Sequence, residues 1–383
     1  MLFSFSNLVA IEHPPQDIGE KACHSPFTGS YPYYEQDAAT FADWEVDYVK
    51  FDGCNLPSGH TAQELTCNMS SILLNTGRDF WFNFHCWHND ACAKCGTSFR
   101  VGPDHHDDWG STSGIISLLA NKRMPFWGPN PTNGWPDPDF VFTGGQGCGA
   151  HSGSGVRCPG QTEDEYLSEF SVWAIAGGQI IFASDPRNMS DFQAKVWFNH
   201  EVLAVYNDSE SFQSVRVIGN GTFSSGAKLD SLPEDGECAL QQQISSAKCA
   251  LGVSFGCNNS SNNTMWTDHG CRGVFTCNGV KDVSCNVDGD GKHHCPCVPS
   301  PPPPSYVFAR PLSNGNVAVV VHNADSTSRT LGFDFASVPD RSWGHSTTLK
   351  VRDLWEHQDL GKYTGHFSAS IPAHGVSFVV LSQ

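Results

Sequence analysis

Strand-like and helix-like stretches alternate over the first half of the chain. Short runs rich in β-branched and aromatic residues are followed by stretches in which apolar residues recur at helical spacing. The predicted strands are Val46–Asp52, Asp79–Phe84, Ser98–Gly102, Pro125–Trp127 and Gln179–Ser184. The predicted helices are Asp37–Trp44, Ala62–Thr76, Asp108–Asn121, Thr162–Ala176 and Asp191–Leu203. Five βα units of this kind predict an α/β fold with a parallel sheet or barrel over residues 17–208.

The last part of the chain changes to a purely β pattern. Its predicted strands are Tyr306–Pro311, Val317–His322, Thr330–Phe335, Thr347–Asp353 and Ser377–Leu381. The SNGN sequence at Ser313–Asn316 is typical of a hairpin turn. The pattern predicts an antiparallel β-sandwich over residues 306–383. The β-rich segment Ser211–Phe223 is expected to supply its first strand, so residues 209–223 are assigned to the same domain.

A segment with little apolar periodicity separates these two regions. Residues 224–305 hold eight of the sixteen cysteines and end in the proline run PSPPPPS, a stiff spacer. Each part of the chain therefore has enough cysteines to close its own disulfides, but the sequence does not fix which cysteines pair. Met265–Gly279 is expected to form a compact disulfide-stapled β module, for which decoration of the sandwich is favoured over carbohydrate binding.

Composition and charge limit the class of partner. The 383 residues are 39% hydrophobic and 16% charged, enough to bury a sizeable core, and their formal net charge is −18. Because such a surface repels polyanions, nucleic acid and anionic membranes are excluded as partners, and neutral or cationic ligands are expected. No apolar run approaches the roughly 18 residues that suggest a membrane span.

The cysteine content predicts an oxidising compartment. Sixteen cysteines are too many for a reducing one. Acceptor sequences for N-glycans recur at Asn68, Asn188, Asn207, Asn220, Asn258, Asn259 and Asn262. We therefore expect a protein of the secretory pathway, either secreted or held in a lysosome or vacuole. The initial MLFSFSNLVA is apolar but lacks the basic start and the cleavage pattern of a good signal peptide.

Two charged residues close the first strand on one face. Side chains alternate along a strand, so Lys50 and Asp52 point to one side, and Val49 and Phe51 point to the other. The carboxyl ends of parallel strands form the active face of α/β barrels, where a neighbouring cation orients a carboxylate. The local sequence supports a functional carboxylate and a plain ion pair about equally.

A second group of carboxylates follows the third predicted strand, in SFRVGPDHHDDW. Asp107 or Asp108 is well explained as a cap of the next helix. Asp104, four residues after Arg100, is not explained in this way and is a candidate functional acid. The two histidines after Asp104 support a metal site only weakly, because adjacent histidines point apart.

Two further pairs of charged residues lie near strand ends. In GWPDPDF, Asp137 and Asp139 flank a proline after a strand, and we expect Asp139 to support a shared pocket. Asp185 and Arg187 end the IIFASDPR strand, where a structural salt bridge is the better explanation.

Neither a metal nor a cofactor is predicted. Cys92 and Cys95 have a zinc-like spacing near His85, and HHCPC at His293–Cys297 is similar, but disulfides are favoured in an oxidising compartment. The DGDG run at Asp288–Gly291 lacks the rest of a calcium loop. Nucleophilic-serine, P-loop and dinucleotide motifs are absent from the sequence. Carboxylates at successive strand ends instead favour cleavage of glycosidic bonds, in which one carboxylate acts on the anomeric carbon and another on the leaving oxygen.

Several stretches together resemble one enzyme family. They are DAATFADWEVDYVKFDGCN (Asp37–Asn55), RVGPDHHDDW (Arg100–Trp109), GWPDPDF (Gly134–Phe140), EFSVWAI (Glu169–Ile175), ASDPRNMS (Ala183–Ser190) and VRDLWEHQDLG (Val351–Gly361). Their order and spacing are similar to those of family 27 glycoside hydrolases, the α-galactosidase or melibiase family. The likeness covers residues 17–208 and continues from residue 306 to the end. It implies a (β/α)8 TIM barrel followed by an antiparallel β-sandwich.

The resemblance also implies a mechanism and roles for residues. It implies a retaining double displacement that releases terminal α-linked galactose without a cofactor. Asp52 would be the nucleophile and Asp104 the acid/base, while Lys50 and Arg100 would bind sugar hydroxyls. Lys50 is expected to keep Asp52 ionised, whereas burial and adjacent negative charge are expected to keep Asp104 protonated at the start.

The loops around the implied nucleophile carry two more expectations from the family. Cys54 would pair with Cys23 and brace the loop beside the nucleophile. After the second strand, the family places a loop that selects the substituent on the second carbon of the sugar. Trp87 and His88 occupy that neighbourhood here, and the chain departs from the family pattern. The choice between α-galactosidase and α-N-acetylgalactosaminidase therefore stays open.

The chain also departs from the family before the DYVKFDGCN strand. Only about 45 residues precede it, where the family has three βα units. We therefore expect an N-terminally truncated barrel of about five βα units, with residues 1–16 foreign to the fold. A non-catalytic, carbohydrate-binding remnant is a further alternative. The expected partner is an α-galactoside on an oligosaccharide, glycolipid or glycoprotein, and a homodimer is compatible with the resemblance.

Overall fold

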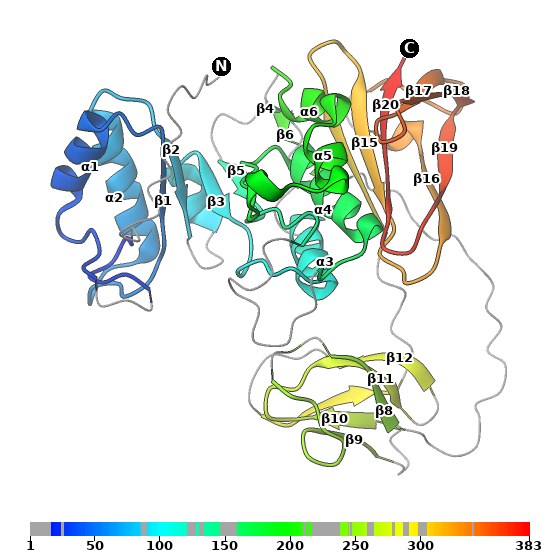
Figure 1. The fold of residues 1–383 in the computed structure, drawn as a ribbon, viewed down its shortest axis with the longest axis horizontal. Coiled ribbons are helices and arrows are strands. Elements are labelled where there is room, and N and C mark those ends of the chain that lie inside the picture. The colour runs from blue at the N-terminus through cyan, green and yellow to red at the C-terminus, as the bar shows by residue number, and fades with distance from the viewer. Residues whose placement is uncertain are drawn as a thin grey trace. The chain divides into compact units, whose positions relative to one another are not determined.

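Figure 1 shows the computed structural model of the chain. The structure describes residues 17–23, 27–85, 90–120, 128–129, 134–145, 159–209, 212–213, 215–216, 238–243, 245, 247–258, 264–277, 280–285, 291–297, 305–338 and 341–383. The chain forms two compact units, and each is described by itself. The first comprises Met1–Asn220 with Ser305–Gln383, and the second comprises Gly221–Pro304.

A parallel sheet forms the first part of the larger unit. Its strands lie side by side in the order β1 (Tyr48–Phe51), β2 (Trp81–Phe84), β3 (Ser98–Arg100) and β5 (Trp135–Asp137). Parallel bridges from Asp17 to Asp52 and from Val141 to Phe182 continue the pattern near its two ends. Along β1, Val49 and Phe51 are buried and Lys50 is only half-buried, because alternate side chains face opposite sides.

The strand predictions succeeded unevenly. Those that became β1, β2 and β3 are confirmed. Gln179–Ser184 was wrong as a full strand, since only Phe182 makes a bridge there. Pro125–Trp127 lies outside the described residues, and the short β4 (Gly128–Pro129) follows it and pairs with β6 (Phe212–Gln213). β5 was not predicted, because proline and aspartate within three residues resemble a turn.

Six α-helices accompany these strands in the described part of the unit. They are α1 (Tyr34–Asp43), α2 (Ala62–Asn75), α3 (Trp109–Leu118), α4 (Glu163–Ala176), α5 (Asp191–Trp197) and α6 (His200–Tyr206). Short 3₁₀ helices are η1 (Asp90–Cys95), η3 (Pro186–Asn188) and η4 (Phe335–Ser337). The capping box predicted for α4 is present, with the Thr162 hydroxyl accepting from Glu165 N and the Glu165 carboxylate accepting from Thr162 N. None of the described helices is long and apolar enough to cross a membrane.

One predicted helix is in fact two. The prediction of a continuous helix over Asp191–Leu203 was wrong, because the chain breaks between α5 and α6. At the break, Asn199 Oδ1 accepts hydrogen bonds from the backbone N–H groups of Glu201 and Val202, which starts α6. Asn199 Nδ2 also donates to the Leu354 carbonyl oxygen at 2.8 Å. A tertiary contact therefore fixes this helix start.

An antiparallel sandwich completes the larger unit. Its main sheet has the order β18 (Gln358–Thr364), β17 (Thr348–Asp353), β20 (Val376–Ser382), β15 (Val317–His322), β14 (Tyr306–Pro311) and β7 (Val215–Arg216). Facing residues of a two-stranded sheet, β16 (Arg329–Asp334) and β19 (His366–Ile371), complete its core. β7 pairs with β14, as expected for the Ser211–Phe223 segment. β18 and β19 were missed, since β18 is an edge strand without a buried face.

The parallel sheet region and the sandwich share one hydrophobic core. α4 is almost entirely buried, and its Phe170 and Trp173 belong to the same cluster as Phe308 and Phe378 of the sandwich. A helix that is buried on nearly all sides is expected to lie between two layers. The confirmed architecture is therefore that of a (β/α) barrel region followed by an antiparallel β-sandwich.

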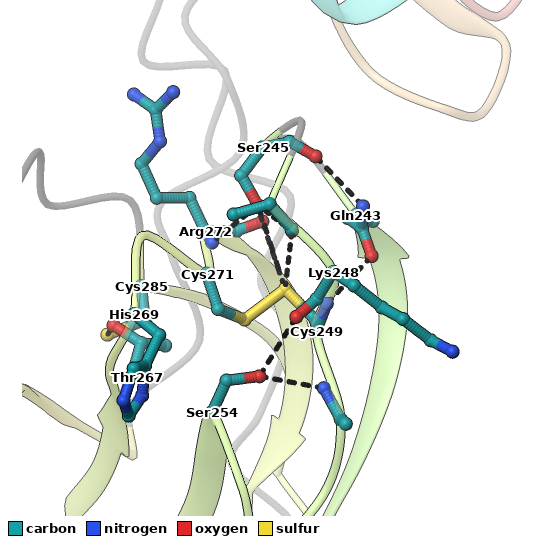
Figure 2. Close-up of a disulfide and its surroundings, with 12 residues drawn as sticks. Gln243, Ser245, Lys248, Cys249, Ser254, Thr267, His269, Cys271, Arg272 and Cys285 are labelled. Atoms are coloured by element: carbon teal, nitrogen blue, oxygen red, sulfur yellow. Dashed lines mark hydrogen bonds between the residues drawn. A yellow bond between two sulfur atoms is a disulfide. The ribbon is translucent and has the colours of Figure 1, made fainter. Parts of the chain in front are cut away.

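The smaller unit is a disulfide-stapled β module. Its two three-stranded sheets contain β8 (Cys238–Gln243), β9 (Phe255–Asn258), β10 (Thr264–Thr267), β11 (Gly273–Cys277), β12 (Val280–Cys285) and β13 (His293–Pro296). All eight cysteines pair within the unit, as Cys238–Cys257, Cys249–Cys271, Cys277–Cys297 and Cys285–Cys295. Figure 2 shows Cys249–Cys271 among loops that are held together through hydrogen bonds to Ser245 and Ser254. Because cysteines form much of its small core, disulfides replace the missing apolar burial.

Candidate active site

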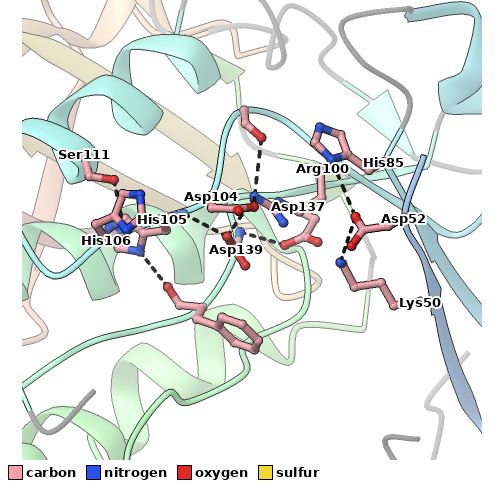
Figure 3. A network of polar contacts seen from close by, with 12 residues as sticks. Lys50, Asp52, His85, Arg100, Asp104, His105, His106, Ser111, Asp137 and Asp139 are labelled. Carbon is pink, nitrogen blue, oxygen red and sulfur yellow. Dashed lines mark hydrogen bonds and ion pairs between the residues drawn. The ribbon is translucent and has the colours of Figure 1, made fainter. Parts of the chain in front are cut away.

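Asp52 lies at the carboxyl edge of the parallel sheet, directly after β1. Its Oδ1 is 3.3 Å from Lys50 Nζ and 3.7 Å from His85 Nδ1 (Figure 3). The register pairs Phe51 with Phe84, so Asp52 and His85 are the next residues on neighbouring strands. His85 was not among the site residues predicted from sequence. Its position directly after a strand, matching that of Asp52, is the signal that identifies it.

The surroundings of Asp52 favour its ionised form. Burial by itself would raise the pKa of Asp52, but the interaction with His85 and the charge of Lys50 outweigh burial. The pKa of Asp52 is consequently held far below its usual range. A carboxylate that stays charged in this way can act as a nucleophile or stabilise a positive charge.

Asp17 supports the loop after β1 and was also missed. Its Oδ1 accepts from Gly19 N at 3.0 Å, and its Oδ2 accepts from Cys54 N at 3.2 Å. Burial raises the pKa of Asp17 to about 6, although its backbone hydrogen bonds act in the opposite direction. Cys23 and Cys54 are joined by a disulfide beside it. The loop after β1 is thus held by a covalent bond and a buried carboxyl group.

Arg100 connects two carboxylates at the end of β3. Its Nη2 donates to Asp104 Oδ1 at 3.1 Å and lies 2.8 Å from Asp139 Oδ2 (Figure 3). The Arg100 side chain is only 3% exposed, whereas that of Asp104 is 67% exposed. Nη2 also points to the Gly102 carbonyl oxygen at 3.5 Å. A buried cation therefore pairs with an exposed carboxylate.

The expectation that Asp104 is kept protonated is wrong for this structure. Burial and the charge of Asp52 act to raise the pKa of Asp104, but the ion pair with Arg100 outweighs them and lowers it. Burial is the largest single effect, but two-thirds of the Asp104 side chain remains in contact with solvent, and the charge and hydrogen bond of Arg100 together exceed the effect of burial. The charge of Asp52 nevertheless acts on Asp104 in the direction of a higher pKa.

Asp137 and Asp139 occupy different positions, which corrects the expectation that both follow a strand. Asp137 is the last residue of β5 and is buried, where it accepts from Asn83 Nδ2 at 2.7 Å and from Asp139 N at 2.7 Å. Burial raises the pKa of Asp137 despite the nearby Arg100. Asp139 has a backbone φ of +77°, which directs its carboxylate back to Arg100.

The other singled-out residues have structural roles or lie outside the described residues. Asp108 caps α3 by accepting from Ser111 N, and Asp185 pairs with the exposed Arg187 at 2.7 Å, as expected. Cys95 pairs with Cys67. Trp87 and His88 lie outside the described residues.

Two groups of potential metal ligands occur among the described residues. The first, Asp17 with Cys23 and Cys54, has both sulfur atoms in a disulfide. The second contains His200, Glu201 and His357. The Glu201 carboxylate already receives two hydrogen bonds from the Arg352 guanidinium, at 2.7 and 2.8 Å, and this cation would repel a metal ion. Neither group suits a metal.

Fold and site together define a class of protein. Charged carboxylates at the carboxyl edge of a parallel sheet, followed by an antiparallel sandwich, are the features of barrel glycoside hydrolases. The family described as Alpha galactosidase A matches residues 14–208, and the Alpha galactosidase C-terminal beta sandwich domain matches residues 304–381. The chain belongs to the α-galactosidase family, glycoside hydrolase family 27.

Relatives and solved structures agree with this assignment. The chain is 32% identical to an α-galactosidase of Oryza sativa over 96% of its own length, and 27% identical to one of Cyamopsis tetragonoloba over the same share. It covers 64% and 65% of those two proteins, somewhat under two thirds. Its fold is similar to that of α-galactosidases from Mortierella vinacea and Saccharomyces cerevisiae, each with a TM-score of 0.61. These are 18% and 17% identical, and the chain covers 75% and 78% of them with 95% and 96% of its own length.

Proposed function

We propose that this protein is a retaining α-galactosidase that removes terminal α-linked galactose from oligosaccharides or glycoconjugates. The observation that carries the proposal is the ionised Asp52 at the sheet edge, paired with Lys50 and His85. The family assignment supports the sugar, because the matched relatives are named α-galactosidases. Lys50 and Arg100 are proposed to contact sugar hydroxyls as well as the carboxylates.

In the first step, an Asp52 oxygen attacks the anomeric carbon and the bond from that carbon to the leaving oxygen breaks. Asp104 gives its proton to the leaving oxygen, so the products are an alcohol and a galactosyl ester of Asp52. In the second step, Asp104 takes a proton from water, whose oxygen attacks the same carbon. The ester bond breaks, and both carboxyl groups return to their starting states.

Asp104 must carry a proton before the first step, although its pKa is lowered here. We propose that a bound sugar covers the exposed Asp104 carboxylate and that Arg100 then pairs mainly with Asp139. Both changes raise the pKa of Asp104, because burial disfavours its charge and the compensating cation is partly withdrawn. The shorter distance from Arg100 to Asp139 than to Asp104 supports this exchange.

Chemical rescue tests the assignment of the two carboxylates. Asp52→Gly should abolish turnover, and added azide should restore a product, β-galactosyl azide, with inverted configuration. Asp104→Gly with azide should instead yield α-galactosyl azide, because azide then attacks the ester of Asp52. The opposite pattern of products would exchange the two roles. Retention of full activity by Asp52→Gly would refute the mechanism.

Substrate choice requires a direct comparison. A chromogenic α-galactoside should be hydrolysed at least about tenfold faster than the matching α-N-acetylgalactosaminide. A roughly tenfold ratio of rates corresponds to a small difference in activation free energy. Faster cleavage of the N-acetyl sugar would make the protein an α-N-acetylgalactosaminidase. Binding of galactose without hydrolysis of either substrate would favour a carbohydrate-binding remnant.

We also propose passage through the secretory pathway, to a secreted or lysosomal or vacuolar location. Six disulfides join described cysteines. The described glycan acceptors Asn68, Asn188 and Asn207 are exposed. Sensitivity of the expressed protein's mass to a glycan-removing enzyme would test this location. Gel filtration would test whether the protein forms a homodimer.

A further inference from the structure

His105 directly follows Asp104 in the chain, yet it is buried and faces away from solvent. Its side chain is 1% exposed and lies between the rings of Phe142 and Trp173, whose centroids are 5.0 and 5.1 Å away. The proposed function gives this histidine no role. A polar ring enclosed by aromatic rings needs a specific reason, because unpaired polar groups are costly in such surroundings.

Both ring nitrogens of His105 have partners that fix one state of the ring. Nδ1 lies 2.8 Å from the Phe140 carbonyl oxygen, which can only accept, so Nδ1 carries the hydrogen. Nε2 lies 2.8 Å from Thr112 Oγ1, and in the neutral ring it accepts from that hydroxyl. Burial lowers the pKa of His105 to about 4, which agrees with a neutral ring. The ring is therefore tied to α3 and to the segment after β5.

The backbone of His105 belongs to the site itself. Its N–H donates to Asp139 Oδ2 at 2.9 Å, the same oxygen that lies 2.8 Å from Arg100 Nη2. The peptide between Asp104 and His105 thus links the two carboxylates that share Arg100 (Figure 3). Rotation of the peptide between Asp104 and His105 would move Asp104 relative to Arg100.

Helix α4 holds the other side of this arrangement. Glu169 Oε1 accepts from Phe142 N at 2.9 Å and lies 3.7 Å from His105 Nδ1, while Oε2 accepts from Thr143 Oγ1 at 2.9 Å. Trp173 Nε1 donates to the Asp139 carbonyl oxygen at 2.9 Å. Three side-chain hydrogen bonds from a buried helix consequently hold the segment 139–143, to which the His105 ring is bonded.

We infer that His105 is a positioning residue for the acid step, setting the direction of Asp104 without touching the substrate. The inference rests on the proposed function, in which Asp104 protonates the leaving oxygen. A misplaced acid slows reactions that need protonation and hardly affects those with a leaving group that departs as an anion. Displacement by about 1 Å can cost on the order of 100-fold in rate.

The test compares two substrates in the variant His105→Leu. Its leucine side chain is similar in size to histidine but can make neither of the two ring hydrogen bonds. Methyl α-galactoside needs an acid, whereas 2,4-dinitrophenyl α-galactoside does not. We expect kcat/KM on the methyl substrate to fall about 10- to 100-fold, with less than about threefold change in kcat/KM on the dinitrophenyl substrate, because kcat/KM reports the first step alone. His105→Asn, which keeps a donor near the Nδ1 position, should recover much of the loss. His106→Leu is the matched control, since the His106 backbone bond to Ser111 remains.

Each outcome decides something different. Equal losses on both substrates, with a lowered melting temperature, would mean that His105 only stabilises the fold and would overturn the inference. Unchanged rates on both substrates would overturn it as well. If the unaltered protein hydrolyses neither substrate, the proposed function fails and the inference fails with it. If the unaltered protein is active, the variants test the inference by itself.

Discussion

Arg100 Nη2 lies 2.8 Å from Asp139 Oδ2, closer than to the carboxylate that is proposed to handle the proton. The guanidinium is buried and keeps its charge, since its pKa is raised by surrounding carboxylates despite burial. Asp139 therefore takes part of the positive field that would otherwise act on Asp104 alone. Asp139, two residues beyond β5, thus affects the pH range in which Asp104 holds its proton.

Asp139→Asn tests this relationship. With the Asp139 charge removed, Arg100 pairs only with Asp104 and lowers its pKa further, since a cation favours the ionised form. A general acid must be protonated, so the alkaline limb of the kcat profile should move to lower pH, with about a tenfold rate loss at neutral pH. The asparagine oxygen still accepts from His105 N, which keeps the loop in place. A limb that moves to higher pH would contradict the argument.

Lys50→Met should affect the other limb of the pH profile. Burial would raise the pKa of Asp52, and Lys50 together with His85 counters it, so removing the lysine charge raises the pKa. Because the nucleophile must be ionised, the acid limb of kcat/KM should move to higher pH, while rates above the limb fall about tenfold or less. Lys362→Met, at an exposed position of β18, is the control and should leave the profile unchanged. An unmoved acid limb in Lys50→Met would show that His85 alone suffices to keep Asp52 ionised.

Glu169→Gln should change the pH dependence of stability. Burial raises the pKa of Glu169 to about 8, although hydrogen bonds from Phe142 and Thr143 oppose it. Between about pH 4.5 and 8 the folded state holds a proton that the unfolded state has lost, so stability decreases as pH rises through this window. Glutamine cannot ionise, so its melting temperature should fall less between pH 5 and pH 8.

A thermal scan at each pH can measure this difference between Glu169→Gln and the unaltered protein. Each kcal/mol corresponds to about 2–4 °C for a domain of this size, so the two proteins should differ by several degrees in their change with pH. At pH 5 the two proteins should be similar in stability, because the protonated carboxyl group and the amide both keep an oxygen that accepts from Phe142 N and a hydrogen that can be donated to the Thr143 hydroxyl. Parallel pH profiles for both proteins would show that Glu169 is already ionised when folded.

Asn199→Ala should weaken the junction with the sandwich. The change removes the cap of α6 and leaves the Leu354 carbonyl oxygen without its donor, for a total of about 2–4 kcal/mol of unfolding free energy. Ser190→Ala removes only the cap of α5, so it should cost about 1 kcal/mol. Urea unfolding with unchanged slopes would measure both. Equal losses would mean that the Leu354 contact contributes nothing.

Periodicity predicted the parts of the fold whose burial is regular. β14 and β15 match their predicted limits, because every residue or nearly every residue in them is apolar and buried. β18 and β5 were missed because an edge strand and a Pro–Asp strand lack that pattern. The break before Asn199 was also hidden, since a cap that depends on a distant carbonyl leaves no periodic signal.

The sequence by itself determined that Lys50 shares a face with Asp52, because alternation in a strand is local geometry. Its ordered motifs also led to the proposal that Asp52 and Asp104 are the two catalytic carboxylates. Only the tertiary structure decided that His85 faces Asp52 and that Arg100 is divided between Asp104 and Asp139. It also overturned the expected protonation of Asp104. The reason is that a pKa depends on charges and burial contributed by segments far apart in the chain, whereas a sequence motif specifies only its own neighbours.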